Sequence, residues 1–258
     1  MALSRRHPAA FAAVLLVGLA STGVAYATVT GSHTPAKVVA SETQIEQGKQ
    51  LFLQGCSSCH GLAAQGSTDG PSLIGVGAAA VDFQVSTGRM PLAAPGIQAM
   101  RKPPVYTEEQ TAALAAYVAS LGAGPAIPTA EDVNTDKADL ALGGELFRTN
   151  CAQCHSVSGK GGALSQGRYA PSLMNADART IYEAMITGPQ AMPVFNDKTL
   201  TKSEKQDIIR YIKELQKEES PGGYSLGRLG PVTEGLFLFI VGLGALFAVA
   251  VWIGAKAK

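Results

Sequence analysis

Residues 56–60 read Cys-Ser-Ser-Cys-His, and residues 151–155 read Cys-Ala-Gln-Cys-His. These two stretches contain all four cysteines of the chain, as two pairs with two residues inside each pair. Cys-x-x-Cys-His is the attachment signature of c-type haem. Two thiols add to the two vinyl groups of the porphyrin, and the adjacent imidazole reaches the iron from the same side. The sequence therefore predicts two covalently attached haem c groups, held by Cys56, Cys59, Cys151 and Cys154, with His60 and His155 as iron ligands.

A single group of this kind is also compatible with a redox dithiol, half a zinc site or a structural disulfide. A zinc site needs four ligands, whereas the two groups together supply six. Both groups also stand at the same place in a repeated unit, which favours haem over the other three interpretations.

The repeated unit occupies residues 42–122 and again residues 137–218. Each copy opens with a glycine and a phenylalanine four residues apart, which share one face of a helix. Each copy ends with a capping box followed by apolar residues at helical spacing, which predicts a terminal helix. The matching residues are Gly48 and Gly143, Phe52 and Phe147, Pro71 and Pro171, Met90 and Met192, Thr107 and Thr201, and Tyr117 and Tyr211.

The sixth iron ligand follows by elimination, because neither copy contains a spare histidine. A methionine thioether is the usual alternative. Met90 and Met192 are the best candidates, since each precedes a proline and follows Thr-Gly at matching places in the repeat. Their rivals are Met100 in the first copy and Met174 and Met185 in the second. We expect the carbonyls of Pro71 and Pro171 to accept hydrogen bonds from the ligating histidines.

Two apolar runs flank the repeat. Residues 1–29 combine a basic start with an uncharged apolar stretch and Ala25-Tyr26-Ala27, which fits either a cleaved export signal or a retained membrane anchor. Residues 235–254 carry no charge and predict a C-terminal transmembrane helix. Because Lys256 and Lys258 follow it, the positive-inside rule predicts a cytoplasmic C-terminus and haem domains on the extracytoplasmic side of the cell membrane.

The net charge is +1, from 21 basic and 20 acidic residues. This balance gives no reason to expect a nucleic-acid partner.

The order of these features resembles class I cytochromes c, which implies an all-α fold of two tandem domains plus the C-terminal transmembrane helix. In that family the first and last helices cross, with Gly and Phe packed against a terminal aromatic. The resemblance gives these roles to Gly48, Phe52 and Tyr117, and to their counterparts in the second copy. The whole plan, including the Gly-rich connector of residues 221–231, resembles the dihaem cytochrome c subunit of the actinobacterial cytochrome bcc complex.

That resemblance implies an electron carrier within a proton-translocating quinol–cytochrome c reductase. Its expected partners are a cytochrome b subunit, a Rieske iron–sulfur subunit and a terminal oxidase. The chain itself is expected to have no catalytic residue. One alternative is a dihaem electron-transfer subunit of another membrane oxidase or of a periplasmic dehydrogenase. Another is a dihaem peroxidase, which is disfavoured because peroxide chemistry needs an open iron position and distal acid–base groups.

Overall fold

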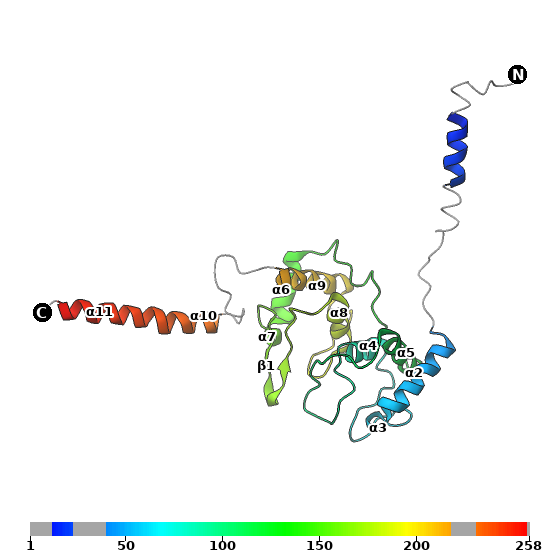
Figure 1. The fold of residues 1–258 in the computed structure, drawn as a ribbon, viewed down its shortest axis with the longest axis horizontal. Helices are drawn as coiled ribbons and strands as arrows, with labels where there is room; N and C mark the ends of the chain where they lie inside the picture. The colour runs from blue at the N-terminus through cyan, green and yellow to red at the C-terminus, as the bar shows by residue number, and fades with distance from the viewer. Residues whose placement is uncertain (1–11, 23–39, 218–230, 257–258) are drawn as a thin grey trace. The chain divides into compact units, whose positions relative to one another are not determined.

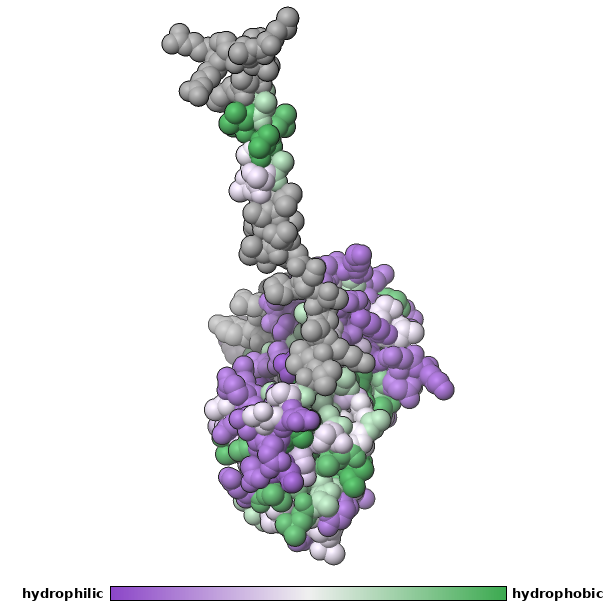
Figure 2. All heavy atoms as spheres, turned by 90° about the vertical axis from the view of Figure 1, so that its right-hand side faces the viewer, coloured by the Kyte–Doolittle hydropathy of each residue, from purple (hydrophilic) through white to green (hydrophobic). Residues whose placement is uncertain are grey.

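The computed structural model describes residues 12–22, 40–217 and 231–256. Most of the predicted export signal, the connector of residues 221–230, and His7 and His33 lie outside the described residues. The chain divides into two parts, Met1–Ser41 and Glu42–Lys258. In the first part the structure describes a short apolar helix, Ala12–Thr22, and Figure 2 shows that its side chains are mainly hydrophobic.

The first haem-type unit is built on two crossing helices, α2 (Glu42–Gly55) and α5 (Glu108–Ser120), with α3 (Ser57–His60) and α4 (Ala78–Ser86) between them in sequence (Figure 1). A Cβ atom on Gly48 would lie 1.9 Å from the carbonyl oxygen of Ala113, so only glycine permits this crossing. Beside the crossing, the rings of Phe52 and Tyr117 pack with centroids 5.3 Å apart. The predicted Gly–Phe–aromatic contact is confirmed.

The second unit repeats this arrangement with α6 (Leu140–Asn150) and α9 (Lys202–Lys217), accompanied by α7 (Ala152–His155) and α8 (Ala178–Thr187). A Cβ atom on Gly143 would lie 2.0 Å from the carbonyl oxygen of Asp207. The rings of Phe147 and Tyr211 are again 5.3 Å apart. The shared residues of the two copies therefore produce the same helix crossing twice.

Both terminal helices begin with the predicted capping box. The backbone N–H of Gln110 donates to the Thr107 hydroxyl at 3.3 Å, while the Gln110 side chain accepts from the Thr107 N–H at 3.0 Å. In α9 the N–H of Glu204 donates to the Thr201 hydroxyl at 3.4 Å, and the Glu204 carboxylate accepts from the Thr201 N–H at 2.7 Å.

The second unit also contains a two-stranded antiparallel ribbon that the sequence did not predict. It consists of β1 (Gly162–Ala163) and β2 (Tyr169–Ala170), joined through the 3-10 turn η1 (Ser165–Gly167). The motif histidine and the following proline are 16 residues apart in the second unit and 11 in the first. The longer loop has room to fold back on itself. The fold class is nevertheless all-α, as expected.

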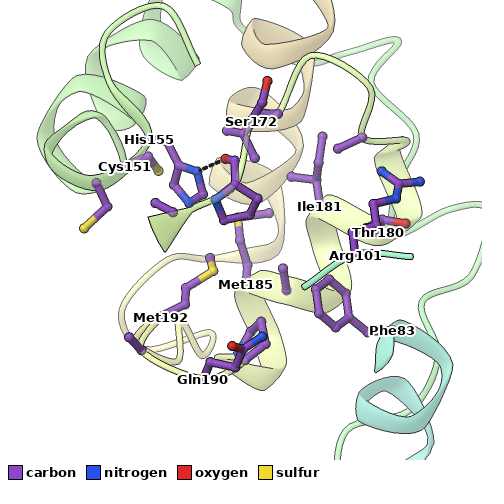
Figure 3. A pocket seen from close by; sticks show the side chains of 18 of the residues that line it. Phe83, Arg101, Cys151, His155, Ser172, Thr180, Ile181, Met185, Gln190 and Met192 are labelled. Carbon is purple, nitrogen blue, oxygen red and sulfur yellow. Dashed lines mark hydrogen bonds between the residues drawn. The ribbon is translucent and has the colours of Figure 1, made fainter. Parts of the chain in front are cut away.

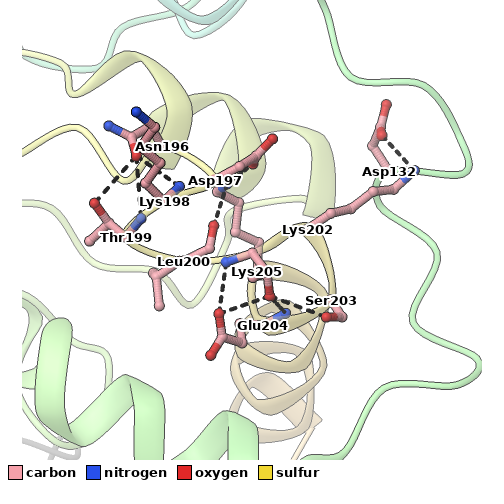
Figure 4. Close-up of polar contacts among 11 residues, drawn as sticks. Asp132, Asn196, Asp197, Lys198, Thr199, Leu200, Lys202, Ser203, Glu204 and Lys205 are labelled. Carbon is pink, nitrogen blue, oxygen red and sulfur yellow. Dashed lines mark hydrogen bonds and ion pairs between the residues drawn. The ribbon is translucent and has the colours of Figure 1, made fainter.

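A buried lysine is a further feature of the second unit. Lys205 of α9 is fully buried, and its ammonium group donates to the Asp197 carboxylate at 2.6 Å and to the Leu200 carbonyl at 2.8 Å (Figure 4). The corresponding residue in α5 is Thr111, whose hydroxyl donates to the Thr107 carbonyl at 2.8 Å. The lysine fastens the loop that precedes α9 to the start of that helix.

The C-terminal helix Thr233–Lys256 runs through α10 (Pro231–Phe237), the π-helical segment η3 (Leu238–Leu243) and α11 (Gly244–Lys256). It has 24 residues and is therefore about 36 Å long. The hydrocarbon core of a bilayer is about 30 Å thick. Among the described residues this is the one helix that is long and apolar enough, by length and composition, to cross a membrane.

Candidate haem sites

The second Cys-x-x-Cys-His group sits on a tight turn between α6 and α7. The backbone N–H groups of Cys154 and His155 both donate to the Cys151 carbonyl, at 3.1 and 2.9 Å. This turn holds the two thiols and the imidazole close together. His155 is buried, and its Nδ1 donates to the Pro171 carbonyl at 2.9 Å. The predicted acceptor is confirmed, and Nε2 is left free to bind a metal.

A cavity of about 400 Å³ opens beside this turn (Figure 3). Cys151, Cys154, His155 and Met192 all line it, and in Figure 3 the Met192 side chain points toward the side of the cavity that carries His155. The structure therefore brings together all four site residues predicted for this domain. Most of the remaining wall is apolar, with contributions from Leu173, Ile181, Met185, Phe195, Ile208 and Ile212.

The rival methionines of the second domain are placed differently. Met174 lies beside Gly159, where a Cβ atom on the glycine would be 2.7 Å from the Met174 methyl group. Met185 also lines the cavity, but it is buried in the core on α8. Its counterpart in the first domain is Val85, which is equally buried and has no ligating atom. Both side chains therefore pack in the cores of their domains.

The first Cys-x-x-Cys-His group repeats the turn. The N–H groups of Cys59 and His60 donate to the Cys56 carbonyl at 3.2 and 3.0 Å. His60 is buried, and its Nδ1 donates to the Pro71 carbonyl at 2.7 Å, which again confirms the predicted acceptor. Cys56 and Met90 both pack against the core of this domain.

Met100, the rival ligand of the first domain, is 55% exposed and lines the cavity of the second domain instead. The structure thus separates it from the core against which Cys56 and Met90 pack.

Burial shifts the pKa values of three motif side chains, Cys56, Cys151 and His155. It raises the pKa of the Cys56 thiol to about 11 and that of the Cys151 thiol to about 12, with a smaller contribution from the neighbouring Cys59 and Cys154. A catalytic redox dithiol needs a lowered thiol pKa, so these values argue against that interpretation. Burial also lowers the pKa of His155, partly opposed by its hydrogen bond to Pro171, which favours the neutral imidazole that ligates metals.

The sequence analysis missed the contribution of the first domain to the second cavity. Phe83, Arg89 and the segment Gln98–Arg101 belong to the first domain, yet all of them line the cavity beside His155. The only sequence signal was the pair of extra residues before Met192, one of which is Gln190. Its side chain accepts from the Ala99 N–H at 3.0 Å and donates to the Ala99 carbonyl at 3.1 Å.

An ionic cluster also joins the two domains, in which the exposed Arg179 meets two buried acidic residues. The Arg179 guanidinium on α8 lies 2.6 Å from the Asp82 carboxylate on α4 and 3.2 Å from the Glu183 carboxyl group. Nothing in the repeat pattern indicated this contact, because neither Asp82 nor Arg179 belongs to a motif or a helix that the sequence predicted.

Two family models match the chain. The model described as cytochrome c matches residues 45–122, and the model described as cytochrome C oxidase, cbb3-type, subunit III matches residues 138–212. Cytochrome c domains imply covalently bound haem c, and two such domains support two haems.

Curated relatives match nearly the whole chain. The cytochrome bc1 complex cytochrome c subunit of Corynebacterium efficiens is 47% identical, covering 97% of this chain and 90% of the relative. The subunit of the same name from Corynebacterium diphtheriae is 47% identical over 97% of this chain and 95% of the relative. The subunit of that name from Mycobacterium tuberculosis is 48% identical, covering 94% of this chain and 89% of the relative. With the helix crossings, the repeated histidine sites and these similarities, the chain belongs to the family of cytochrome c subunits of the cytochrome bc1 complex.

Proposed function

We propose that this chain is the dihaem electron carrier of a respiratory quinol–cytochrome c reductase, passing electrons from a Rieske iron–sulfur centre toward a terminal oxidase. The observation that carries the proposal is the cavity beside His155, which gathers the four residues predicted to hold the second haem. The family of the chain points to the same role.

The residues of the second cavity fit haem c. Cys151 and Cys154 would hold the haem through thioether bonds, and His155 Nε2 and the Met192 thioether would bind its iron. Apolar side chains would cover the faces of the macrocycle and exclude water. When bound, haem c supplies a one-electron iron couple.

The corresponding assignment in the first domain is Cys56, Cys59, His60 and Met90. The contact of Met90 with the domain core, and the exposure of Met100, support Met90 as the axial ligand. Methionine ligation raises the potential of a haem, which suits acceptance of electrons from a Rieske centre of high potential. We take residues 42–122 and 137–218 as the bounds of the two domains.

The rest of the chain would anchor these domains in the cell membrane. The helix Thr233–Lys256 supports this, and the lysines at its C-terminal end support a cytoplasmic C-terminus with extracytoplasmic haem domains. Residues 1–29 would direct export, either as a cleaved signal or as a second anchor.

Within the complex, the chain would move electrons only. Quinol oxidation, and the proton translocation coupled to it, would belong to a partner cytochrome b subunit and a Rieske subunit. Residues of this chain would hold the two irons, exclude water from them and set their potentials.

A second candidate is an electron-transfer subunit of a haem–copper oxidase. The match of residues 138–212 to the model described as cbb3-type oxidase subunit III favours it.

The test is purification of the full chain, tagged after Lys258, from its native membranes in mild detergent. We expect b-type haem and a Rieske protein to co-purify, and quinol to reduce the c haems. The measurements are the reduced-minus-oxidised haem spectrum and subunit identification. Co-purification of c-type haem with a copper-containing oxidase and without a Rieske protein would instead favour the second candidate.

A further inference from the structure

The first domain extends a strap, Gln98–Arg101, over the cavity of the second domain. The Gln98 side chain makes two hydrogen bonds to the backbone of Tyr169, accepting at 2.8 Å and donating to its carbonyl. Ala99 makes two more with the Gln190 side chain, in the loop that carries Met192. The strap is therefore fastened on both sides of the cavity that it lines.

Two arginines of the first domain face this cavity. Arg89 is only 7% exposed, and its guanidinium lies 4.7 Å from the ring centroid of Phe83. Its buried Nη1 has no hydrogen-bond partner among the described residues. Arg101, at the end of the strap, donates to the Asn175 carbonyl at 3.4 Å. Both arginines line the cavity.

Arg89 is buried, whereas Arg101 lies at an exposed position. Within the part of the chain that the structure describes, neither arginine forms an ion pair, and the nearby Asp82 is paired with Arg179. Burial and the charge of Arg101 both lower the pKa of Arg89, so the two guanidinium groups repel one another. A buried cation without a partner is costly, and an anion placed in the cavity would remove that cost.

The chemistry of haem c supplies such an anion at this side of the cavity. The vinyl groups that react with cysteines lie on one edge of the porphyrin, and the two propionate carboxylates lie on the opposite edge. Figure 3 shows Cys151 and His155 on one side of the cavity and Arg101, Thr180 and Phe83 on the other. A haem bonded to the cysteines would therefore direct its carboxylates toward the arginine side.

We propose that Arg89 and Arg101 of the first domain bind the propionate carboxylates of the haem in the second domain, so that the second haem site is complete only when both domains are present. This inference rests on the proposed binding of haem c. Reduction adds negative charge to the haem, so two adjacent cations favour the reduced state. Because Arg89 directly precedes Met90, one loop would then serve both haems.

The test compares Arg101→Gln with Arg101→Lys and with Arg148→Gln in the full chain within its purified complex. Arg148 is an exposed arginine on α6, so its substitution removes the same charge at a distance from the cavity. Potentiometric titration of the c haems measures both reduction equilibria. Met192→His in a parallel series identifies the second haem, because loss of a thioether ligand lowers its potential.

We expect Arg101→Gln to lower the reduction equilibrium constant of the second haem at least about fivefold at low ionic strength. The lysine variant should retain most of the native value, and Arg148→Gln should change neither haem. Resonance Raman spectra should show a shifted propionate bending mode in Arg101→Gln alone. In folded protein, Arg89→Gln should lower the reduction equilibrium constant of the second haem and shift the propionate mode more than Arg101→Gln does.

Unchanged potentials and an unchanged propionate mode in Arg101→Gln, with both haems bound, would overturn the inference and leave the proposed function intact. A shift confined to the first haem would overturn it as well. A native chain without covalent haem would instead contradict the proposed function.

Discussion

The two haem domains share a helix crossing and a histidine site, but they differ in the loops around that site. In both, a glycine lets the first helix meet the last, and a proline carbonyl orients the motif histidine. The second domain adds a longer loop with a β-ribbon, two extra residues in its methionine loop, and contacts to the strap of the first domain. Residues shared by the copies build the site, and residues that differ join the copies together.

The matching helices α4 and α8 likewise contain positions that act alike in both copies and positions that differ. Val85 and Met185 occupy matching buried positions and both serve packing. Two residues earlier, the pair is Phe83 and Glu183, and both are buried. Phe83 lines the neighbouring cavity, whereas Glu183 joins the cluster with Asp82 and Arg179. A matching position thus contributes to the domain interface in two different ways.

The largest effect should come from disrupting the helix crossing that the two domains share. Gly48→Ala and Gly143→Ala each place a Cβ atom 1.9 or 2.0 Å from a backbone oxygen of the partner helix. We expect each to destabilise its own domain by more than about 2 kcal/mol, because backbone must move. Thermal unfolding and haem content per chain measure this. Gly96→Ala, where nothing lies within 4 Å, is the control, and native stability of either helix variant would contradict the argument.

Replacing the methionines tests whether the two sites use the same ligand. Met90→Leu and Met192→Leu keep side-chain volume but remove the thioether, so each should abolish about half of the methionine-ligated haem signal and lower one potential. Near-infrared magnetic circular dichroism follows the iron–sulfur bond. Met100→Leu and Met185→Leu are the matched controls. Loss of signal in a control would move the ligand to that residue.

The sequence predicts the shared features well because each rests on local physics. Gly48 and Phe52 are four residues apart, and Thr107 and Gln110 are three apart, so spacing predicts a shared helix face and a capping box. The packing of Gly48 and Phe52 against the last helix came from the resemblance to class I cytochromes c. The strap could not be found in this way, since Gln98 and Tyr169 are separated by 71 positions. Burial of Lys205 was equally hidden, because a lysine in an amphipathic pattern is expected to face solvent.

Glu183 belongs to the ionic cluster between the domains, and its counterpart in the first domain is the uncharged Phe83. Burial raises its pKa to about 9, and a hydrogen bond to the charged Asp82 carboxyl adds to this. The folded state therefore keeps a proton that the unfolded state releases above about pH 4.5, and stability falls as pH rises from about 5 to about 9. Glu183→Gln mimics the protonated form, so it should flatten this decline and stabilise the protein at neutral pH.

Thermal unfolding of the full chain across that pH range measures the effect of Glu183→Gln. Glu145→Gln, at an exposed position on α6, should leave the decline as it is in the native chain. A decline that persists in Glu183→Gln would show that another group is responsible for it.

The smallest effects should come from the two capping boxes, which are alike in form but differ in charge. Thr107→Ala and Thr201→Ala should each cost about 1 kcal/mol at neutral pH. The reciprocal partner is the neutral Gln110 in α5 and the carboxylate of Glu204 in α9, whose pKa is lowered by hydrogen bonds from the Thr201 backbone and hydroxyl groups. Stability gained through the carboxylate is present above its unfolded pKa and is lost as pH falls through the lower folded value. The cost of Thr201→Ala should therefore shrink in acid. That of Thr107→Ala should shrink too, because the Thr107 hydroxyl also hydrogen-bonds the Glu109 carboxylate and helps to lower its pKa. Urea unfolding at neutral and acid pH would measure both costs. Equal costs at both pH values would mean that the charge of Glu204 adds nothing to its cap.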